Sequence, residues 1–492
     1  MRKVFFTVLL TGTVVLSTLS AAGEETSGLI EKWTDSNGTV LSGKKVDGMI
    51  EGYGTAEYPS GATYIGQFSG GLRNGQGTYT WSDGDVYSGR WKDDAQTGYG
   101  TYIYISGDIH QGMWKDGKRT GYGTYTLARG DIYKGMFKDS KRTGYGTYTW
   151  TDGTEYSGMF EENYMDGLGI KFNKNGEVEE IGEWEPSRYD EGNETRYSVL
   201  AENTGKECRD TENLIQYGTF NKEGNLTGEG ISYDTAAGII QIGNFQNGIL
   251  TGQGVIYSKP DGVWRTGEMT DGKLTGLGVL VYGDRGWYQG EFFEDVFAGD
   301  GTYIWPNGDA YNGMWEENER TGYGTYFFTN GDVYSGMWEG NEQTGYGTYA
   351  FASGNAYIGM FNESRRDGLG IVLNTEGTVE EIGEWEPSEY DEDKNSKNSI
   401  LVEDMDKEHR DTENLIQYGI FNNEGKLVGE GISYDTATGI VQIGNFENGV
   451  LSGEGLIYSQ TDGTGKIGIA VNGELNGQNI MFYSDGTWKK GE

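Results

Sequence analysis

The most concentrated groups that could do chemistry in this sequence are carboxylates in two segments of similar sequence. Each segment contributes four of them: Glu183, Glu185, Asp210 and Glu212 in the first, and Glu384, Glu386, Asp411 and Glu413 in the second. Clustered carboxylate oxygens are ligands that Ca²⁺ prefers, and two carboxyl groups at a set separation can hydrolyse a glycosidic bond. The structural alternative is that the segments are latches, which fix where the chain leaves and re-enters a sheet.

A second candidate surface consists of tyrosine rings that recur at regular intervals. These are Tyr99, Tyr122, Tyr145, Tyr323 and Tyr346. If they are exposed on one face of a sheet, they could form a glycan-binding surface, because a tyrosine presents an apolar ring together with a polar hydroxyl group. The structural alternative is that these rings only shield the second face of a thin sheet.

Histidine and cysteine chemistry has little scope in this chain, which contains only His110, His409 and Cys208. A single cysteine excludes an intramolecular disulfide and a cysteine-rich zinc site. His110 occupies a position at which neighbouring units carry tyrosine, and His409 stands in the second segment where Cys208 stands in the first. We therefore predict no catalytic residue, and no cofactor other than Ca²⁺ under the calcium interpretation.

The chain is strongly acidic, with 76 acidic and 38 basic residues and a formal net charge of −38. This charge disfavours nucleic acid as a partner, since phosphate binding needs a basic footprint. It also disfavours direct binding to anionic lipid. The expected partner is a protein or a component of the cell envelope.

Two hairpin loops nevertheless carry a group of basic residues, called here the basic ridge: Lys115, Lys118, Arg119, Lys138, Lys141 and Arg142. At the positions 201 residues later, the four lysines are replaced by Glu316, Glu319, Glu339 and Glu342. Ridges of opposite charge could pair between molecules and steer self-association. The alternative is neutral variation of solvated loops.

The tripeptide Arg129-Gly130-Asp131 would be an adhesion motif in another setting. The equivalent turns of other units also end in Gly-Asp, as in Gly107-Asp108 and Gly308-Asp309. The Gly-Asp pair therefore belongs to a repeat, and only the arginine is incidental.

A 23-residue repeat must position all of these residues, and its central glycines are Gly66, Gly89, Gly112, Gly135 and Gly158. Each is followed by a polar loop, then by Gly-x-Gly and a tight turn. Side chains alternate between two faces with a period of two, which predicts one β-hairpin per unit. Because glycine weakens a strand interior, we expect these glycines to leave room for aromatic rings that lie directly on the backbone.

The unit resembles the MORN repeat, a hairpin that begins Tyr-x-Gly-x-Trp/Phe and continues to Gly-x-Gly, as in Tyr87-Ser-Gly-Arg-Trp91 and then Gly98-Tyr-Gly. The resemblance covers most of residues 41–488, in about sixteen units, and weakens where aromatics are missing, at 265–269 and 466–470. It implies an all-β fold and an interaction or scaffolding role rather than an enzyme. Because each hairpin of a repeat array contacts chiefly its neighbours, we expect an elongated single sheet on the order of 150 Å long at ~4.8 Å per strand.

The array is duplicated, because the central glycines and the acidic segments recur 201 positions later. This predicts six parts: a signal peptide at 1–22, a first array at 23–184, an acidic insertion at 185–213, a second array at 214–385, a second acidic insertion at 386–414, and C-terminal repeats with a cap at 415–492.

Residues 1–22 have the pattern of a secretory signal. Arg2 and Lys3 precede a mostly apolar stretch, and Ser20-Ala21-Ala22 supplies the small residues of a cleavage site. We therefore expect an exported protein, which is secreted, periplasmic or at the cell surface. The predicted function is an exported, non-enzymatic repeat scaffold that binds through an extended β surface. The alternative is a glycan- or Ca²⁺-dependent ligand-binding module, and a carboxylate-based hydrolase is the third interpretation.

Overall fold

The computed structural model describes residues 31–491 apart from 187–197, 203, 284, 388–398, 403, 405, 462, 476–478 and 484–486. The predicted signal peptide and the middle of both predicted insertions lie outside the described residues. Strands make up 70% of the structure, and the described part contains no helix, which confirms the predicted all-β repeat array. No described segment is therefore a helix that could cross a bilayer.

The strands form three antiparallel sheets, and within the first two of them every strand pairs with its neighbours in sequence. The first sheet has fifteen strands: β1 (Glu31–Thr34), β2 (Val40–Val46), β3 (Met49–Glu57), β4 (Thr63–Ser69), β5 (Leu72–Thr80), β6 (Val86–Lys92), β7 (Ala95–Ile103), β8 (Ile109–Lys115), β9 (Lys118–Thr126), β10 (Ile132–Lys138), β11 (Lys141–Thr149), β12 (Glu155–Glu161), β13 (Tyr164–Phe172), β14 (Val178–Pro186) and β15 (Ser198–Leu200).

The second sheet has seventeen strands: β16 (Glu207–Thr211), β17 (Leu214–Phe220), β18 (Leu226–Asp234), β19 (Ile239–Gln246), β20 (Ile249–Ser258), β21 (Val263–Thr270), β22 (Lys273–Tyr282), β23 (Trp287–Phe293), β24 (Val296–Ile304), β25 (Ala310–Glu316), β26 (Glu319–Phe327), β27 (Val333–Glu339), β28 (Glu342–Ala350), β29 (Ala356–Asn362), β30 (Arg365–Leu373), β31 (Val379–Pro387) and β32 (Ser399–Val402).

The third sheet has nine strands: β33 (Glu408–Thr412), β34 (Leu415–Phe421), β35 (Leu427–Asp435), β36 (Ile440–Glu447), β37 (Val450–Ser459), β38 (Thr464–Val471), β39 (Glu474–Leu475), β40 (Ile480–Phe482) and β41 (Trp488–Lys490). The first two sheets each end inside a predicted acidic insertion, which therefore contains short strands as well as residues that lie outside the described part.

Most hairpins are closed by a two-residue turn of the type that matches strand twist. In the turn between β6 and β7, Asp93 and Asp94 have φ angles of 46° and 67°. Positive φ at both central residues is the mark of a type I′ turn. The opposite end of the unit turns at Gly107, which has φ 90° and donates its backbone N–H to the carbonyl of Tyr104 at 2.8 Å. The predicted hairpin per unit is therefore confirmed.

The predicted packing of rings on glycine is also confirmed. Tyr64 is fully buried, and a Cβ atom added at Gly77 on the adjacent strand would lie 2.2 Å from its hydroxyl oxygen and 2.4 Å from a ring carbon. The hydroxyl group donates to the carbonyl of Gln67 at 2.9 Å. The same arrangement recurs at other tyrosines of the repeat: Tyr87, Tyr133, Tyr156, Tyr288, Tyr311, Tyr334 and Tyr357.

In some units a leucine takes the place of the tyrosine ring. Leu274 is fully buried, and its side chain lies within 2.9 Å of the Cβ positions of Gly267 and Gly278. In that unit, Arg265 occupies the tyrosine position, nine residues before Leu274. In the unit of Tyr311, the residue nine positions after the tyrosine is Arg320. In both units, therefore, one of these two positions holds an apolar or aromatic side chain and the other holds an arginine. This exchange explains why the resemblance weakens at 265–269 although the hairpin is intact.

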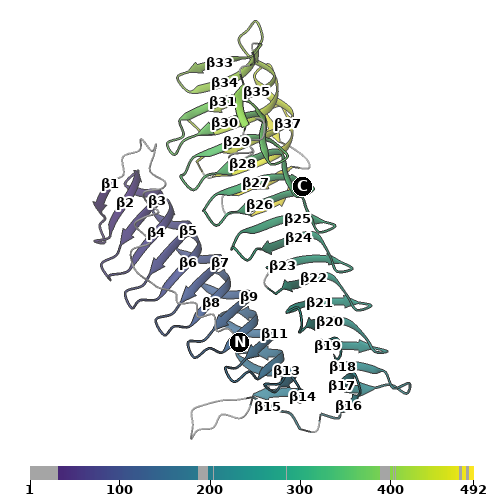
Figure 1. The fold of residues 1–492 in the computed structure, drawn as a ribbon. Coiled ribbons are helices and arrows are strands. Elements are labelled where there is room, and N and C mark those ends of the chain that lie inside the picture. The colour runs from purple at the N-terminus through teal and green to yellow at the C-terminus, as the bar shows by residue number, and fades with distance from the viewer. Residues whose placement is uncertain are drawn as a thin grey trace, which may run out of the picture.

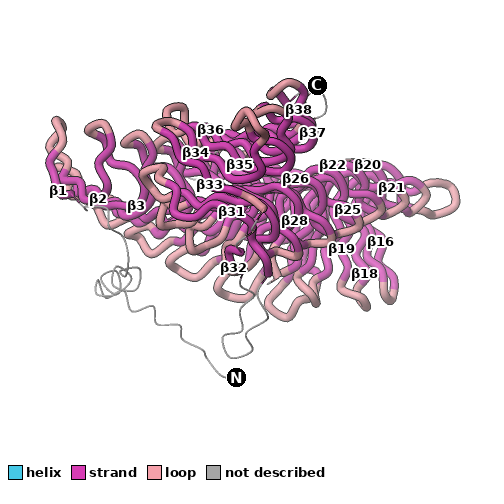
Figure 2. Tube along the Cα trace, turned by 90° about the horizontal axis from the view of Figure 1, so that it is seen from above, coloured by secondary structure: helices cyan, strands magenta, loops and turns pink. Residues whose placement is uncertain are grey.

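The array forms three sheets instead of the expected elongated single sheet, because the chain doubles back at both insertions. Figure 1 shows the first sheet, purple to blue, beside the second sheet, with the third sheet, yellow, against the β26–β31 end of the second. Figure 2 shows this stacking from above. Leu168 and Ile170 of the first sheet share one buried cluster with Ile231 and Ile242 of the second. A second cluster joins the second and third sheets, and it contains Ile371 of the second sheet and Ile443 of the third.

The apolar second face of each sheet is the physical reason for this doubling back. Ile231, Ile242 and Ile371 are at most 2% exposed, and they point away from the face that carries the repeat tyrosines. An apolar face must be covered by another layer, and the two halves of the chain cover each other. The structure therefore consists of shorter stacked sheets instead of the expected ribbon of about 150 Å. The longest sheet, with seventeen strands, measures about 80 Å across its strands.

Candidate functional site

The predicted acidic segments form the two corners at which the chain passes from one sheet to the next. Glu183 on β14 of the first sheet forms an ion pair with Lys206, which lies just before β16 of the second sheet. Glu384 and Lys407 form the same ion pair between the second and third sheets. The lysine side chains are only 14% and 9% exposed. The two corners therefore share one design.

The other predicted carboxylates lie on the surface of the corners. These are exposed: Glu185, Asp210, Glu212, Glu386, Asp411 and Glu413. In the described part of the chain, no group of three or more His, Cys, Asp or Glu residues could hold a metal ion. Trp184 anchors the first corner, since its indole N–H donates to the carbonyl of Gly169 and its ring contacts Tyr156. This arrangement fits the latch interpretation, and the Ca²⁺ and catalytic interpretations stay predictions.

The five tyrosines predicted as a glycan surface are not exposed. Tyr122, Tyr145 and Tyr323 are 8%, 2% and 0% exposed, and Tyr99 and Tyr346 are half-buried. Tyr122 contacts Trp264 and Trp287 of the second sheet, with ring centroids 5.4 and 5.8 Å apart. Burial raises the pKa of Tyr122 to about 12. These rings hold the sheets together, and the prediction that they face solvent is wrong.

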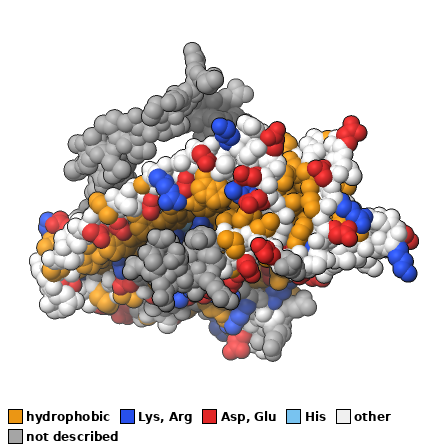
Figure 3. Space-filling model, turned by 90° about the horizontal axis from the view of Figure 1, so that it is seen from below, with side chains coloured by type: hydrophobic (Ala, Val, Ile, Leu, Met, Phe, Trp, Pro, Cys, Tyr) orange, Lys and Arg blue, Asp and Glu red, His pale blue; other side chains and the backbone are white. Residues whose placement is uncertain are grey.

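Rings with partial exposure lie on the opposite face, where they form two continuous tracks. The first ring track is Tyr58, Tyr79, Trp81, Tyr102, Tyr104 and Tyr125. The second ring track is Tyr282, Tyr303, Trp305, Tyr326, Phe328, Tyr349 and Phe351. All of these rings are half-buried. Figure 3 shows hydrophobic side chains gathered on the surface, bordered by charged side chains.

A repeated aspartate fixes two tyrosines in each track. Asp85 accepts a hydrogen bond from the hydroxyl of Tyr102 at 2.7 Å and another from the backbone N–H of Ile105 at 2.8 Å. Each unit is thereby tied to the next one along the array. The other aspartates of this kind are Asp108, Asp131, Asp309 and Asp332. The Gly-Asp of the repeat thus has a structural role.

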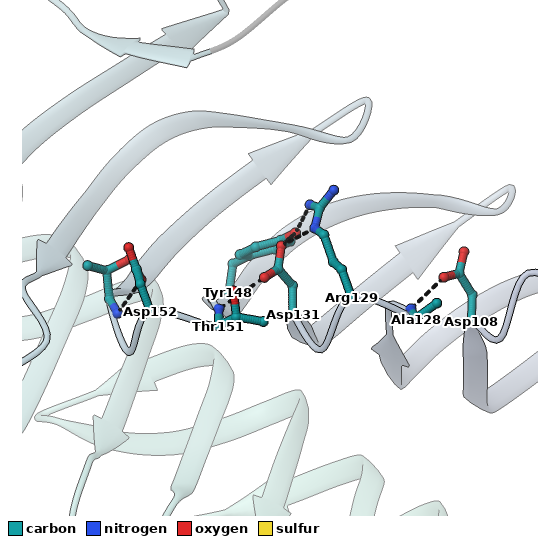
Figure 4. A network of polar contacts seen from close by, with 8 residues as sticks. Asp108, Ala128, Arg129, Asp131, Tyr148, Thr151 and Asp152 are labelled. Carbon is teal, nitrogen blue, oxygen red and sulfur yellow. Dashed lines mark hydrogen bonds and ion pairs between the residues drawn. The ribbon is translucent and has the colours of Figure 1, made fainter.

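Asp131 of the adhesion-like tripeptide is one of these aspartates and is 2% exposed. Figure 4 shows it between Arg129, Tyr148 and Thr151, with contacts of 2.6, 2.8 and 3.0 Å. Burial raises the pKa of this carboxyl group, but the hydrogen bonds from the three residues outweigh burial and leave the pKa below its usual value. A buried carboxylate with these partners is not presented to a receptor.

Replacing Asp131 by asparagine should lower the free energy of unfolding at pH 7 by about 1–3 kcal/mol, because buried partners lose a charged acceptor. A carboxyl group with a depressed pKa in the folded state stabilises above its unfolded pKa of about 3.9, and this contribution is lost as the pH falls through the folded value. The difference between wild type and Asp131→Asn in urea unfolding should therefore shrink below pH 4. A difference that persists undiminished at pH 2.5 would contradict this role. Asp210→Asn, at an exposed strand position, is the matched control.

Two of the four lysines of the basic ridge form ion pairs within the first sheet. Lys118 pairs with Asp139 at 3.1 Å and Lys141 pairs with Glu162, each across the neighbouring turn. Arg119 and Arg142 do not point outward as charges, since they stack on rings such as Phe137 and Phe160. Self-association through ridges of opposite charge stays a prediction. The cationic surface that the basic ridge offers for it is smaller than the sequence suggests.

His110 replaces a repeat tyrosine and lies over the same glycine pair. A Cβ atom at Gly123 would lie 2.7 Å from its ring. Both ring nitrogens are buried without a hydrogen-bond partner in the described part of the chain. Burial, and then the charge of Arg119, lowers the pKa of His110 to about 3. The histidine is a ring filler with an unpaired polar edge and has no acid–base role.

Replacing His110 by tyrosine should stabilise the protein, with a gain that grows as the pH falls. An unfolded histidine takes up a proton near pH 6.5 while the folded one stays neutral to about 3, so wild-type stability falls between these values by up to ~1.4 kcal/mol per pH unit. At pH 5 the variant should therefore gain about 2 kcal/mol beyond its gain at pH 7.5 in urea unfolding. His409→Tyr, at an exposed position, should leave this acid sensitivity in place. A stability difference for His110→Tyr that is independent of pH would refute the assignment.

Two cavities accompany these features. A cavity of about 210 Å³ between the first two sheets is lined by Tyr99, Tyr122, Lys134 and Trp287 among others. A second, of about 480 Å³, opens beside Arg265, where a leucine has replaced the repeat ring. The missing tyrosine at Arg265 is a sequence signal for the second cavity. The first cavity has no such signal, because it forms only where strands distant in the sequence meet.

Comparisons with known proteins identify the repeat. The MORN repeat matches eleven segments: 42–63, 64–86, 87–109, 110–132, 133–155, 156–178, 242–262, 266–287, 288–310, 311–333 and 334–356. Among solved structures, the chain is similar to the TCP domain of SAS-4 (dCPAP) from Drosophila melanogaster in complex with a proline-rich motif of Ana2 (dSTIL), at 14% identity and a TM-score of 0.20, covering 32% of this chain and 92% of that chain. It is also similar to a streptogramin B lyase, at 11% identity and a TM-score of 0.11, covering 64% of this chain and 95% of that one.

Both TM-scores are too low to support an argument about fold or function. The comparison with curated proteins gave no match. The eleven MORN matches together span half of the chain, and the segments between 64 and 178 follow the 23-residue period of the hairpins. The chain belongs to the MORN repeat family.

Proposed function

We propose that the protein is an exported, non-enzymatic scaffold that binds a protein or a cell-envelope component along the faces that carry the ring tracks. MORN repeat proteins are generally non-enzymatic scaffolds for interactions. The observation that supports the proposal most directly is the pair of ring tracks, because rows of half-buried rings on rigid sheets offer apolar contact area at little cost in conformational entropy. The buried second faces hold the sheets together and leave these tracks as the extended aromatic surfaces.

Affinity capture from the cell envelope tests the binding surface. The bait is the chain from residue 23, and the matched variants are Trp305→Ala, on the second ring track, and Phe293→Ala, which removes a 65% exposed ring outside both tracks. A partner that is retained by wild type and by Phe293→Ala, but is lost from Trp305→Ala together with the equivalent Tyr104→Ala, supports the proposal. A partner that binds all variants equally well contradicts the assignment of the surface.

The export part of the proposal rests on residues 1–22, which lie outside the described part of the structure. N-terminal sequencing of the protein isolated from its own cells should give a chain that begins at Gly23, the residue after the predicted cleavage site. A protein that keeps Met1 and stays with the cytosolic fraction would contradict export.

A further inference from the structure

We propose that each ring track binds a proline-rich segment of a partner protein, in the polyproline II conformation and with basic flanking residues. This inference rests on the proposed scaffold function and names the chemistry of its partner. Aromatic-lined grooves are the surfaces that recognise polyproline II segments, because the preformed helix loses little conformational entropy on binding. The protein itself has only 5 prolines in its sequence, so the occupant is another chain.

Ring pairs make up most of each track, with two pairs in the first track and three successive pairs in the second. In the second ring track, Tyr303 lies 4.7 Å from Trp305, and Tyr326 lies 4.5 Å from Phe328, between ring centroids. Successive pairs are also in contact, since Trp305 lies 5.1 Å from Tyr326. The track is therefore an unbroken aromatic surface in which the ring pairs recur at regular intervals along the sheet.

The spacing of the pairs matches the pitch of the proposed ligand. One repeat unit contributes two strands, so successive ring pairs are spaced by about 9.6 Å at the usual distance between strands. A polyproline II helix has three residues per turn and rises about 3.1 Å per residue, which gives a pitch of about 9.3 Å. The difference accumulates to only about 1 Å over four units. One face of such a helix can thus meet the same ring pair in every unit.

The rings are fixed before any ligand arrives. Tyr326 donates its hydroxyl to Asp309 at 3.0 Å, and Tyr349 donates to Asp332 at 2.9 Å. Beneath the track, the guanidinium group of Arg320 lies 5.5 Å from the Tyr326 ring. A preorganised surface loses little entropy on binding. A stiff ligand on a stiff surface is the combination that this geometry favours.

The charges around the tracks select the residues that flank the prolines. Asp309 and Asp332 place a carboxylate beside Tyr326 and Tyr349 of the second track, and the whole chain carries a net charge of −38. Charge complementarity between a binding surface and its ligand raises the rate of association and disfavours partners of the wrong sign. Lysine or arginine beside the prolines is therefore expected, and acidic proline-rich segments are disfavoured.

Comparison of the two halves of the chain separates the tracks from the variable loops. The residues 201 positions after Tyr102 and Tyr104 are Tyr303 and Trp305, and Trp150 is matched by Phe351. Trp81 and Tyr125 are likewise matched by Tyr282 and Tyr326, whereas Tyr58, Tyr79 and Phe328 of the tracks face Lys259, Leu280 and Leu127 in the other half. The part of the tracks that is aromatic in both halves is the part that a shared ligand would contact.

The test is binding of a fluorescein-labelled peptide of twelve prolines with two lysines at each end, measured by fluorescence anisotropy with the chain from residue 23. A peptide with the same lysines but with Gly-Ser in place of proline is the control ligand. Wild type should bind the proline peptide at least tenfold more tightly than the control peptide. Trp305→Ala combined with Tyr104→Ala should lose at least tenfold in affinity, and Trp305→Leu with Tyr104→Leu should lose affinity as well, which separates loss of the ring from loss of bulk.

Phe293→Ala should bind as wild type does, and far-UV circular dichroism should show that every variant keeps its strands. Equal binding of the two peptides, or binding unaffected by the ring variants, overturns the inference. Retention of wild type on an immobilised polysaccharide, without binding of the proline peptide, also overturns it in favour of a glycan ligand. In both cases the scaffold function stands if affinity capture still yields a partner that depends on Trp305 and Tyr104. That function fails separately if no captured partner depends on these rings.

Discussion

Replacing Gly324 by alanine is expected to destabilise the protein by about 3 kcal/mol, the upper part of the usual range for overpacking a well-packed interior. The added Cβ atom would lie 2.2 Å from the hydroxyl oxygen of Tyr311 and 2.4 Å from two of its ring carbons. Gly324 has no left-handed φ angle, so the cost is steric. Tyr311 is fully buried and contacts Trp315 and Trp338, each with centroids 5.2 Å apart, so its ring has no room to move.

Urea unfolding of a double-mutant cycle with Tyr311→Ala checks this prediction. Removing the ring alone should also be costly, because a buried aromatic residue is lost. With the ring absent, the added methyl group at Gly324 has space, so the double variant should be more stable than the sum of the two single changes by about 1–3 kcal/mol. Strict additivity of the two changes would contradict packing of the ring on the glycine.

Replacing Ile231 by aspartate should separate the first and second sheets while the hairpins stay folded. Ile231 is 0% exposed and lies in the cluster that joins the two sheets. An unpaired carboxylate buried there costs several kcal/mol. The hairpins depend mainly on contacts with their neighbours in the array. The expected result is therefore a larger radius of gyration in small-angle X-ray scattering with a far-UV spectrum close to that of wild type.

Two control variants define the cause of this effect. Ile231→Val should cost about 1 kcal/mol and leave the dimensions unchanged. Leu277→Asp introduces the same charge at a strand residue that is 73% exposed and should change neither stability nor size. Global loss of strand signal in Ile231→Asp, without an expanded but folded state, would show that the sheets are not independent units.

The hairpin, its turns and the seating of rings on glycine follow from the sequence, because all of them depend on residues within one or two repeat units. Tyr64 shares a face with Gly66, two positions later, and Gly66 pairs with Gly77 across the hairpin. The aspartate contact could also have been found, since the Asp of each Gly-Asp precedes its tyrosine by seventeen positions, as in Asp85 and Tyr102. The sequence also shows that the pair Tyr311 and Arg320 is replaced by Arg265 and Leu274 in another unit, with the same spacing of nine residues.

The stacking of the sheets could not be predicted from the same pattern. A period of two separates the two faces of a strand but does not say which face another layer covers. Tyr122 meets Trp264, which lies more than a hundred residues later in the chain. Local spacing carries no information about such a contact, so the buried tyrosines were predicted as the exposed surface. Three rings of the second ring track are equally hard to predict, because Trp305, Phe328 and Phe351 directly follow strand ends, where the sequence indicates polar turns.

The central claim is that the repeat array doubles back at two corners instead of extending as one ribbon. Small-angle X-ray scattering of the chain from residue 23 in dilute solution tests it most directly. Three stacked sheets, the longest with seventeen strands, predict a longest dimension much nearer to about 80 Å than to 150 Å. A pair-distance distribution that extends to about 150 Å or beyond, with the profile of a thin rod, would contradict the account.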